Sequence, residues 1–145
     1  MANEKLLEVE NLTKYFYKSQ GFLGKKKQIV KSVDYVNFHI LRNETFGLVG
    51  ESGCGKTTVG RTITRLYEPT EGKIIFDGQD ISGLSKKELL PYRKKMQMIF
   101  QDPYASLNAR MTVMDIVCEA LDLHSELKSK DDKNKRVYEL LDRVG

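Results

Sequence analysis

The stretch from Gly50 to Thr58, "GESGCGKTT", carries the most specific pattern in this chain. Gly50, four intervening residues, and then Gly55, Lys56 and Thr57 match the motif G-x-x-x-x-G-K-[ST]. Glycines allow backbone conformations that a side chain blocks, so successive N–H groups can point into one concavity and bind anionic oxygens. The motif therefore predicts a phosphate-binding loop.

The side chains at the end of the loop have distinct predicted roles toward a nucleotide. A helix that begins near Lys56 adds its positive end, and the Lys56 ammonium reaches the outer phosphates. The Thr57 hydroxyl is expected to coordinate the Mg²⁺ that bridges those phosphates, and Thr58 to donate to the innermost one. The predicted nucleotide-binding residues of the loop are Gly50, Glu51, Ser52, Gly53, Cys54, Gly55, Lys56, Thr57 and Thr58.

The flanking sequence favours this prediction over a chance match in a glycine-rich turn. "TFGLVG" (45–50) is almost wholly apolar, which is typical of a strand buried on both faces of a parallel sheet. "KTTVGRTITRLY" (56–67) has apolar residues at helical spacing, and "EPTEG" (68–72) ends the predicted helix. A strand, a loop and a helix in this order are the context that the motif requires.

The rest of the chain alternates between strand and helix patterns. Period-two alternation predicts antiparallel strands at 5–18 and 29–40, joined by the loop "SQGFLGKKKQ". "KIIFDGQDI" (73–81) indicates a strand that runs into an Asp-Gly turn, Ser85 and Glu88 suit a helix cap, and "MQMIF" (96–100) predicts a second buried strand. Helices are predicted at 112–128 and 136–145, with a charged connector, "KSKDDKNK", between them.

Length and composition limit the class of protein. The chain has 145 residues, 40% hydrophobic and 30% charged, which suits one soluble globular domain. No apolar run reaches the roughly 18 residues of a membrane-spanning helix, and the opening "MANEKLLEVE" lacks the apolar core of a secretory signal. We therefore expect a cytosolic chain unless a partner holds it at a membrane.

Charge and cysteine content exclude other classes. The net charge is +4, and much of the excess comes from one short segment that contains Lys25, Lys26, Lys27 and Lys31. A solvated cluster explains this excess more simply than a nucleic-acid partner, so none is expected. Cys54 and Cys118 lie far apart without metal-ligand spacing, which predicts free thiols in a reducing compartment.

Four segments together resemble the ATP-binding subunits of ABC transporters. They are "FGLVGESGCGKTT", "PTEGKIIFDGQDI", "MQMIFQDPYASLNARMTV" and the basic insertion within "YFYKSQGFLGKKKQIVKSVDYVNFHI". The last two resemble the branch that imports oligopeptides and dipeptides. The resemblance covers nearly the whole chain, and the order of the segments makes it more specific than the loop alone.

The resemblance implies roles outside the loop. Phe16 aligns with the aromatic residue that stacks on adenine, with Tyr15 and Tyr17 as neighbours that could substitute; ordinary strand aromatics are the alternative. Gln101 matches a glutamine that contacts Mg²⁺ or the attacking water, against the alternative of a loop-capping amide. Lys56 and Gln101 are thus the implied catalytic residues. The segment 102–110 and the following helix would face membrane subunits, and Ala109 stands where the family usually has proline.

Several groups that the family uses for hydrolysis have no match here. "KIIFD" ends at Asp77, but glycine follows it and it precedes Gln101, so it is not the family's acidic strand ending in Asp-Glu. "LSKKE", from Leu84, has lysines in place of the glycines of an LSGGQ loop. His39 and His124 fall in the wrong order for the family's histidine. The resemblance therefore implies ATP binding without hydrolysis by this chain, which we expect to be a fragment.

The implied fold class is α/β: the N-terminal portion of a P-loop NTPase of the ABC type, with an incomplete core sheet. An antiparallel β subdomain would occupy 1–44, with a basic loop at 18–31. The phosphate-loop core would occupy 45–103 and the start of a helical subdomain 104–145. Without its neighbour in the core sheet, "TFGLVG" would leave an apolar edge, so we expect poor solubility or marginal stability.

The function implied by the resemblance is to energise an importer for oligopeptides or dipeptides with ATP and Mg²⁺. Its partners would be transmembrane permease subunits, a second ATP-binding subunit and, indirectly, an extracytoplasmic solute-binding protein. The chain would lie at the cytoplasmic face of the membrane. Three alternatives stay open: a nucleotide-binding module that never hydrolyses, an importer of another solute such as nickel, and a small phosphate-loop kinase.

Overall fold

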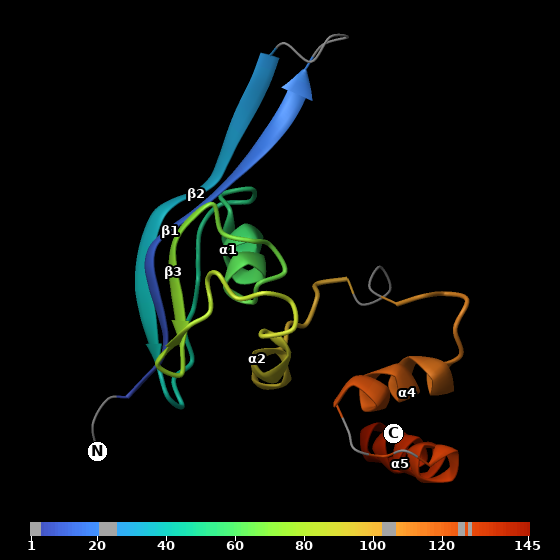
Figure 1. Cartoon of the computed structure of the whole chain (residues 1–145). Helices are drawn as coiled ribbons and strands as arrows, with labels where there is room; N and C mark the ends of the chain where they lie inside the picture. Colours follow the sequence, from blue (N-terminus) through green and yellow to red (C-terminus); the bar gives the residue numbers. More distant parts are fainter. Residues whose placement is uncertain (1–3, 21–25, 103–106, 125–126, 128) are drawn as a thin grey trace. The chain divides into compact units, whose positions relative to one another are not determined.

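The computed structural model describes residues 4–20, 26–102, 107–124, 127 and 129–145. The chain divides into two compact units, residues 1–97 and 98–145. The first holds an antiparallel sheet with helices α1 and α2, and the second holds helices α4 and α5 (Figure 1).

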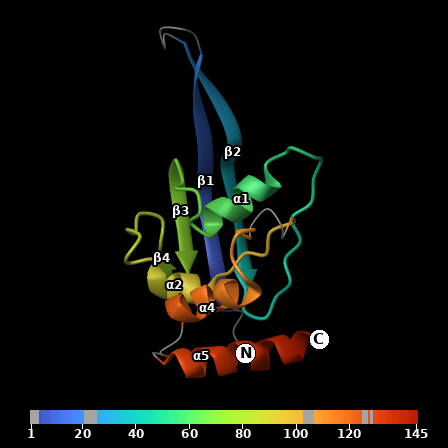
Figure 2. The same ribbon diagram turned by 90° about the vertical axis from the view of Figure 1, so that its right-hand side faces the viewer.

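The sheet of the first unit has four antiparallel strands in the order β2-β1-β3-β4. Strand β1 pairs with β2 along nearly its whole length but with β3 only between Leu7 and Thr13. Beyond Thr13, β1 and β2 therefore continue as a two-stranded ribbon (Figures 1 and 2). The bounds are Lys5–Gln20 for β1, Lys26–Leu41 for β2, Glu71–Phe76 for β3 and Gln79–Asp80 for β4.

The two antiparallel strands predicted from alternation are confirmed, but the loop between them is shorter than predicted. Strand pairing continues through Lys18 opposite Gln28 to Gln20 opposite Lys26, inside the expected loop at 18–31. Each added residue extends an existing antiparallel ladder, which outweighs the weak loop signal of the lysines and serine. The rest of the predicted loop, 21–25, lies outside the described residues.

One face of the sheet carries the core of the first unit. Leu7 and Val9 of β1 and Ile74 and Phe76 of β3 point to this face, and Leu12 joins them beyond the register shift of β1. Val59 of helix α1 (Lys56–Ile63) belongs to the same core, and Figure 2 shows α1 against the sheet. Val9 lies opposite Ile74, and Leu7 opposite Phe76, so the two strands bury matching apolar side chains. The buried apolar residues of this core are Leu7, Val9, Leu12, Val33, Val59, Ile74, Phe76, Ile81 and Leu89.

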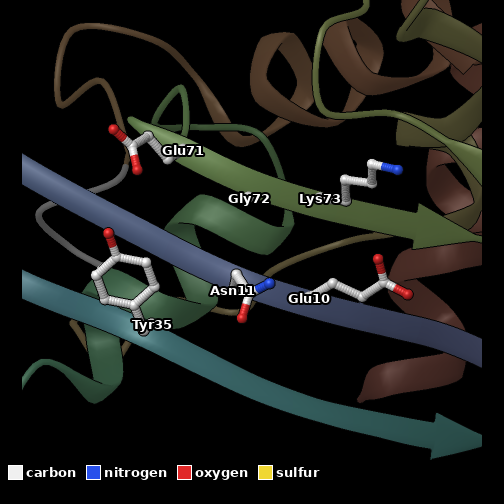
Figure 3. A pocket seen from close by; sticks show the side chains of 6 residues that line it. All are labelled: Glu10, Asn11, Tyr35, Glu71, Gly72 and Lys73. Atoms are coloured by element: carbon white, nitrogen blue, oxygen red, sulfur yellow. The ribbon is translucent and has the colours of Figure 1, made fainter.

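A local irregularity brings β1 and β3 unusually close. The register between these strands shifts between Glu10 and Thr13, and Asn11 adopts a positive φ of 50°. Gly72 has a φ of 91°, and a Cβ atom placed on it would lie 2.4 Å from the carbonyl oxygen of Asn11. The irregularity borders a shallow pocket of about 630 Å³ (Figure 3), which is lined by Glu10, Asn11, Tyr35, Glu71, Gly72 and Lys73.

The two predicted core strands, "TFGLVG" and "MQMIF", are wrong. Residues 45–50 and 96–100 form no strand, and the side chains of Val49 and Ile99 are 90% and 98% exposed. A strand of a parallel sheet needs neighbours on both sides, and no described strand pairs with either segment. Phe46 instead stacks on Phe38 of β2, with ring centroids 5.1 Å apart, which holds the start of the first segment against the sheet.

Helix α1 ends earlier than predicted. Its last residue is Ile63, whereas the sequence pattern predicts a helix to residue 67. Arg65 adopts a positive φ of 57° and is buried, and its guanidinium donates to the carbonyls of Ile81 (3.0 Å) and Leu84 (3.1 Å). These hydrogen bonds stabilise the turn at Arg65 more than another turn of helix would stabilise the chain there. They also attach the end of α1 to the segment after β4.

Ser85 and Glu88 contact each other, but the prediction that they cap a helix is wrong, because α2 begins at Leu90 with Leu89 as its N-cap residue. The Glu88 carboxylate accepts hydrogen bonds from the Ser85 backbone N–H (2.8 Å) and hydroxyl (2.6 Å). It closes a turn just before helix α2, which spans Leu90–Lys95.

The described part of the second unit contains helices α4 (Val113–His124) and α5 (Lys130–Val144). The predicted helix at 112–128 is confirmed in α4, where the Thr112 hydroxyl donates to the Asp115 carboxylate (2.6 Å) at the helix start. The predicted charged connector is largely helical, because α5 begins at Lys130. The acidic residues in its first turn interact favourably with the positive end of the helix dipole, and Lys133 forms an ion pair with Asp122 of α4.

Asp77, in the turn between β3 and β4, connects three parts of the first unit. Its carboxylate accepts a hydrogen bond from Lys95 of α2 (3.1 Å) and pairs with Arg42, which follows β2. Arg42 also pairs with Glu4 (2.9 Å). The Lys95 hydrogen bond, and then the charge of Arg42, hold the pKa of Asp77 below its ordinary value.

This lowered pKa predicts a loss of stability in acid. The stabilisation is fully present above the ordinary aspartate pKa of about 3.9 and is lost as the pH falls through the lower pKa of the folded chain. We expect the urea midpoint of the wild type to fall more steeply than that of Asp77→Asn between about pH 5 and pH 2. Parallel profiles for the two proteins over this range would contradict the role of Asp77.

Candidate nucleotide-binding site

The predicted phosphate loop follows the irregular segment 45–50 and leads into α1. Gly53 and Gly55 have φ values of 83° and 100°, which favour glycine. Gly55 is the N-cap residue of α1 and lies directly against β2, since a Cβ atom on it would lie 2.3 Å from the carbonyl oxygen of Ser32. Only glycine allows this approach, which fixes the C-terminal end of the loop to the sheet.

The start of α1 presents unpaired donors toward the loop. The first intrahelical hydrogen bond is donated by the Val59 N–H to the Gly55 carbonyl (2.9 Å). The N–H groups of Lys56, Thr57 and Thr58 precede this bond, so they have no acceptor inside the helix. The first turn of α1 contains no acidic residue. An anion at this end would therefore meet three donors and the positive end of the helix dipole.

Lys56 adds a full positive charge to the same loop. Its Nζ atom donates to the carbonyl oxygens of Gly50 and Glu51, each at 2.7 Å, and lies 3.5 Å from the Sγ atom of Cys54. The ammonium is thus held by the backbone of the loop. Phosphate oxygens can replace these carbonyl acceptors with stronger, charge-assisted hydrogen bonds.

The residues present also fit a magnesium ion that arrives with phosphates. The described residues contain no group of three or more His, Cys, Asp and Glu side chains that could hold a metal by themselves. Thr57 is exposed at the helix start, so its hydroxyl oxygen is accessible to a hard cation. Such an ion usually keeps several waters and takes its remaining ligands from substrate phosphates and one or two protein oxygens.

Phe16 belongs to a cluster that joins β1 to α1. Its ring meets the ring of Tyr67 edge to face, with centroids 5.4 Å apart, and the Nζ atom of Lys14 lies 5.0 Å from its centroid. Lys14 also donates to the Glu68 carbonyl (2.8 Å), and Arg61 of α1 donates to the Tyr67 hydroxyl (2.9 Å). Phe16 is therefore held in place beside the segment that follows the phosphate-loop helix.

The two neighbouring tyrosines have different surroundings. The Tyr15 hydroxyl donates to Asp34, and Lys31 lies 4.9 Å from the Tyr15 ring centroid. Tyr17 is 60% exposed. Sequence reasoning missed Tyr67 and Lys14 as supports of Phe16, because their contacts depend on how β1 meets the chain after α1, and no local pattern encodes that.

Gln101 is exposed and belongs to the unit of residues 98–145, so its position relative to Lys56 stays a prediction. Residues 103–106 of the segment predicted to face membrane subunits lie outside the described residues, and 107–110 are exposed. Cys54 and Cys118 are free thiols, as predicted. None of the described helices is both long and apolar enough to cross a membrane.

A glycine-dependent turn, free N–H groups at a helix start and a lysine ammonium held by the same turn define a phosphate-binding loop of the nucleotide-binding class. The sequence profile described as "ABC transporter" matches residues 33–145. The chain belongs to the ABC transporter family, which confirms the resemblance seen in the sequence.

Individual relatives agree with this assignment. The chain is 53% identical over 143 residues to the oligopeptide transport ATP-binding protein OppF of Bacillus subtilis, covering 98% of this chain and 45% of the relative. It is 49% identical to the dipeptide transport ATP-binding protein DppF of Lactococcus lactis, covering 98% and 44%. The chain thus spans less than half the length of these curated relatives.

A solved structure supports the predicted fold class. The dimeric ATP-binding cassette MJ0796, in a post-hydrolysis state with ADP and Pi, matches with a TM-score of 0.74 and 26% identity. The match covers 94% of this chain and 56% of that chain. An antiparallel sheet with a few helices is consistent with the N-terminal portion of an ABC ATPase, so the predicted fold class is confirmed.

Proposed function

We propose that this chain binds ATP as part of the energising subunit of an ABC importer for oligopeptides or dipeptides. The observation that carries the proposal is the Lys56 ammonium, held at 2.7 Å by two carbonyls of a glycine-rich loop at the start of α1. The names of the similar proteins support the peptide as cargo. A solute such as nickel is the alternative cargo.

Each part of the loop has a role in this proposal. The backbone N–H groups from Gly50 to Thr58 cradle the phosphates, and Lys56 neutralises the outer ones. Thr57 and Gln101 would hold Mg²⁺, which neutralises phosphate charge when it is bound. Phe16 stacks on the adenine ring, and Tyr67 and Lys14 fix the orientation of the Phe16 side chain.

Hydrolysis is proposed for the whole protein and not for this sequence alone. The sequence contains no apolar strand ending in Asp-Glu and no LSGGQ-like segment. A water-activating carboxylate and groups that stabilise the transition state are needed for phosphoryl transfer. The chain as it stands therefore acts as a nucleotide-binding module, and Lys56 and Gln101 contribute to catalysis only when the missing groups are supplied.

The proposed surroundings follow from the family. Transmembrane permease subunits and a second ATP-binding subunit would be the direct partners, at the cytoplasmic face of the membrane, with an extracytoplasmic solute-binding protein acting through the permease. The proposed organisation has a β subdomain at 1–44, a phosphate-loop core at 45–103 and the start of a helical subdomain at 104–145. A phosphate-loop kinase is disfavoured, because no arginine-rich lid is evident in the sequence.

Binding of a fluorescent ATP analogue, with and without Mg²⁺, tests the proposal. Saturable binding that Mg²⁺ strengthens and unlabelled ATP displaces is the expected result. A soluble, folded chain that shows no saturable binding would overturn nucleotide binding by this chain.

The role of Phe16 can be separated from that of the phosphate loop. Phe16→Leu removes the aromatic face, so we expect ATP binding to weaken about three- to tenfold, in line with roughly 0.5–1.5 kcal/mol for an aromatic contact. Binding of inorganic triphosphate, which has no base, should be unchanged. Tyr17→Leu is the matched control and should leave both affinities unaltered. Equal losses for ATP and triphosphate would show that Phe16 acts only through the fold.

A further inference from the structure

Helix α1 carries side chains of interest at both of its ends. Its first residue is Lys56, which belongs to the phosphate loop, and Arg61 lies in its last turn. The two residues are five positions apart, which is about 7.5 Å along the axis of a helix. A group that Arg61 holds in place therefore keeps a fixed distance from the phosphate loop.

Arg61 holds Tyr67 at two points. The Arg61 carbonyl accepts a hydrogen bond from the Tyr67 backbone N–H (3.0 Å), and the Arg61 guanidinium donates one to the Tyr67 hydroxyl (2.9 Å). The guanidinium carbon also lies 5.7 Å from the centroid of the Tyr67 ring. One hydrogen bond fixes the backbone of Tyr67 and the other fixes the tip of its side chain, so the ring cannot change rotamer without breaking the second bond.

Tyr67 in turn contacts Phe16, the residue proposed to stack on adenine. The two rings meet edge to face at 85°, with their centroids 5.4 Å apart, which is a favourable arrangement of aromatic rings. Phe16 is only partly buried, so part of its ring stays accessible to a ligand. Arg61 therefore sets the orientation of the Tyr67 ring, and the Tyr67 ring limits that of Phe16.

Hydrogen bonds between the segment 67–70 and β1 keep the two rings close together. The Thr70 N–H donates to the Thr13 carbonyl (2.8 Å), and the Thr70 hydroxyl accepts from the Tyr15 N–H (2.9 Å). These bonds do not involve the Arg61 side chain. Substitution of that side chain should therefore release the Tyr67 ring without detaching the segment from the strand.

We propose that Arg61 is a positioning residue for the base of the nucleotide and acts through Tyr67 on Phe16. An aromatic ring that is already ordered loses less conformational freedom when a base stacks on it, so the base binds more tightly. Helix α1 then sets the span between the phosphates at its start and the base near its end. This inference rests on the proposed ATP binding and extends it to a residue outside both the phosphate loop and β1.

Affinities for ATP and for inorganic triphosphate, both measured by titration calorimetry, test the role of Arg61. Arg61→Met removes the donor, so we expect it to weaken ATP binding about threefold, the lower end of the loss expected for Phe16→Leu, because the ring is freed but not removed. Triphosphate, which has no base, should bind as it does to the wild type. Tyr67→Phe, which removes only the acceptor hydroxyl, should show the same loss, and Arg61→Lys, which keeps a donor, should recover most of the ATP affinity.

A double-variant cycle tests whether Arg61 acts through Phe16. In a Phe16→Leu chain, Arg61→Met should cause no further loss of ATP affinity, because no ring remains to be positioned. Arg42→Met is the control for a general loss of stability, since it breaks ion pairs with Glu4 and Asp77. It should lower the urea midpoint but leave the ratio of ATP affinity to triphosphate affinity at its wild-type value.

The outcomes that would overturn this role are distinct from those that would overturn ATP binding. Equal losses of ATP and triphosphate affinity in Arg61→Met would overturn the role, because Arg61 would then act only through the fold. A loss that persists in the Phe16→Leu chain would overturn it as well. Wild-type ATP affinity in Arg61→Met would remove the role of Arg61 and leave ATP binding intact. A folded wild-type chain that binds neither ligand would overturn the proposed function and this inference with it.

Discussion

Lys56→Ala is expected to weaken ATP binding about ten- to a hundredfold. Among the residues that the structure describes, its ammonium is the one full positive charge held by the loop backbone from Gly50 to Gly55, through hydrogen bonds of 2.7 Å to the carbonyls of Gly50 and Glu51. Hydrogen bonds to charged groups contribute roughly 1.5–3 kcal/mol each, which corresponds to this range of affinity. Titration of a fluorescent ATP analogue into the wild type and the variant measures the ratio directly.

The matched control for this prediction is Lys86→Ala, which removes the same charge from an exposed position outside the loop. It should leave ATP affinity unchanged, because Lys86 makes no contact with the loop backbone in the described structure and salt screens exposed charges. Near-equal affinities of wild type and Lys56→Ala would show that nucleotide, if bound, lies elsewhere. Urea unfolding of both variants should show a cooperative transition, so that a loss of ATP affinity in Lys56→Ala does not come from an unfolded chain.

Gly72→Ala is expected to destabilise the first unit by about 2–5 kcal/mol. A residue with a side chain at a φ of 91° costs about 1–2 kcal/mol, and forcing apart a packed region costs about 1–3 kcal/mol more. The added Cβ would lie 2.4 Å from the Asn11 carbonyl oxygen and 2.6 Å from that of Glu10, and backbone atoms of β1 cannot rotate away. Because domains are stable by only about 5–15 kcal/mol, the urea midpoint should fall markedly.

Substitutions at two other glycines separate the cost of a positive φ from the cost of a steric clash with the added Cβ atom. Gly78 has a φ of 77° with no atom within 4 Å of an added Cβ, so Gly78→Ala should show the strain alone. Gly83 has neither a positive φ nor a close neighbour, so Gly83→Ala should be near neutral. The urea midpoint should be highest for Gly83→Ala, lower for Gly78→Ala and lowest for Gly72→Ala. A Gly72→Ala protein as stable as Gly78→Ala would mean that β1 and β3 can separate without cost.

The parts of the fold that sequence predicted well depend on local patterns. Alternation over residues 5–18 places Leu7 and Val9 on one face, and the structure buries both. The spacing of Gly55 and Lys56 fixes a turn and a helix start within a few residues, and both are present. These patterns depend only on residues that are close in sequence, so the structures they predict form without contacts from distant segments.

The failures concern partners that a local pattern cannot supply. The apolar run 45–50 predicts a buried strand, but burial needs strands on either side, and Val49 is exposed instead. The charged run from 128 predicts a connector, but Lys133 forms an ion pair with Asp122 of α4 and helix α5 begins at Lys130. For the candidate site, the loop was predictable and the support of Phe16 by Tyr67 was not, because it depends on a contact between distant segments.

Because the run 45–50 is exposed, the order of the phosphate loop depends on whether another strand pairs with that run. The C-terminal end of the loop is fixed, because Gly55 lies against Ser32. The N-terminal end follows Val49, which is exposed to solvent, and there the Gly50 carbonyl accepts a hydrogen bond from Lys56. A strand that paired with 45–50 would order the backbone that a phosphate must also order. The two events would then be reciprocal: each would strengthen the other by the same factor, so nucleotide occupancy would report on whether the sheet has gained a neighbour.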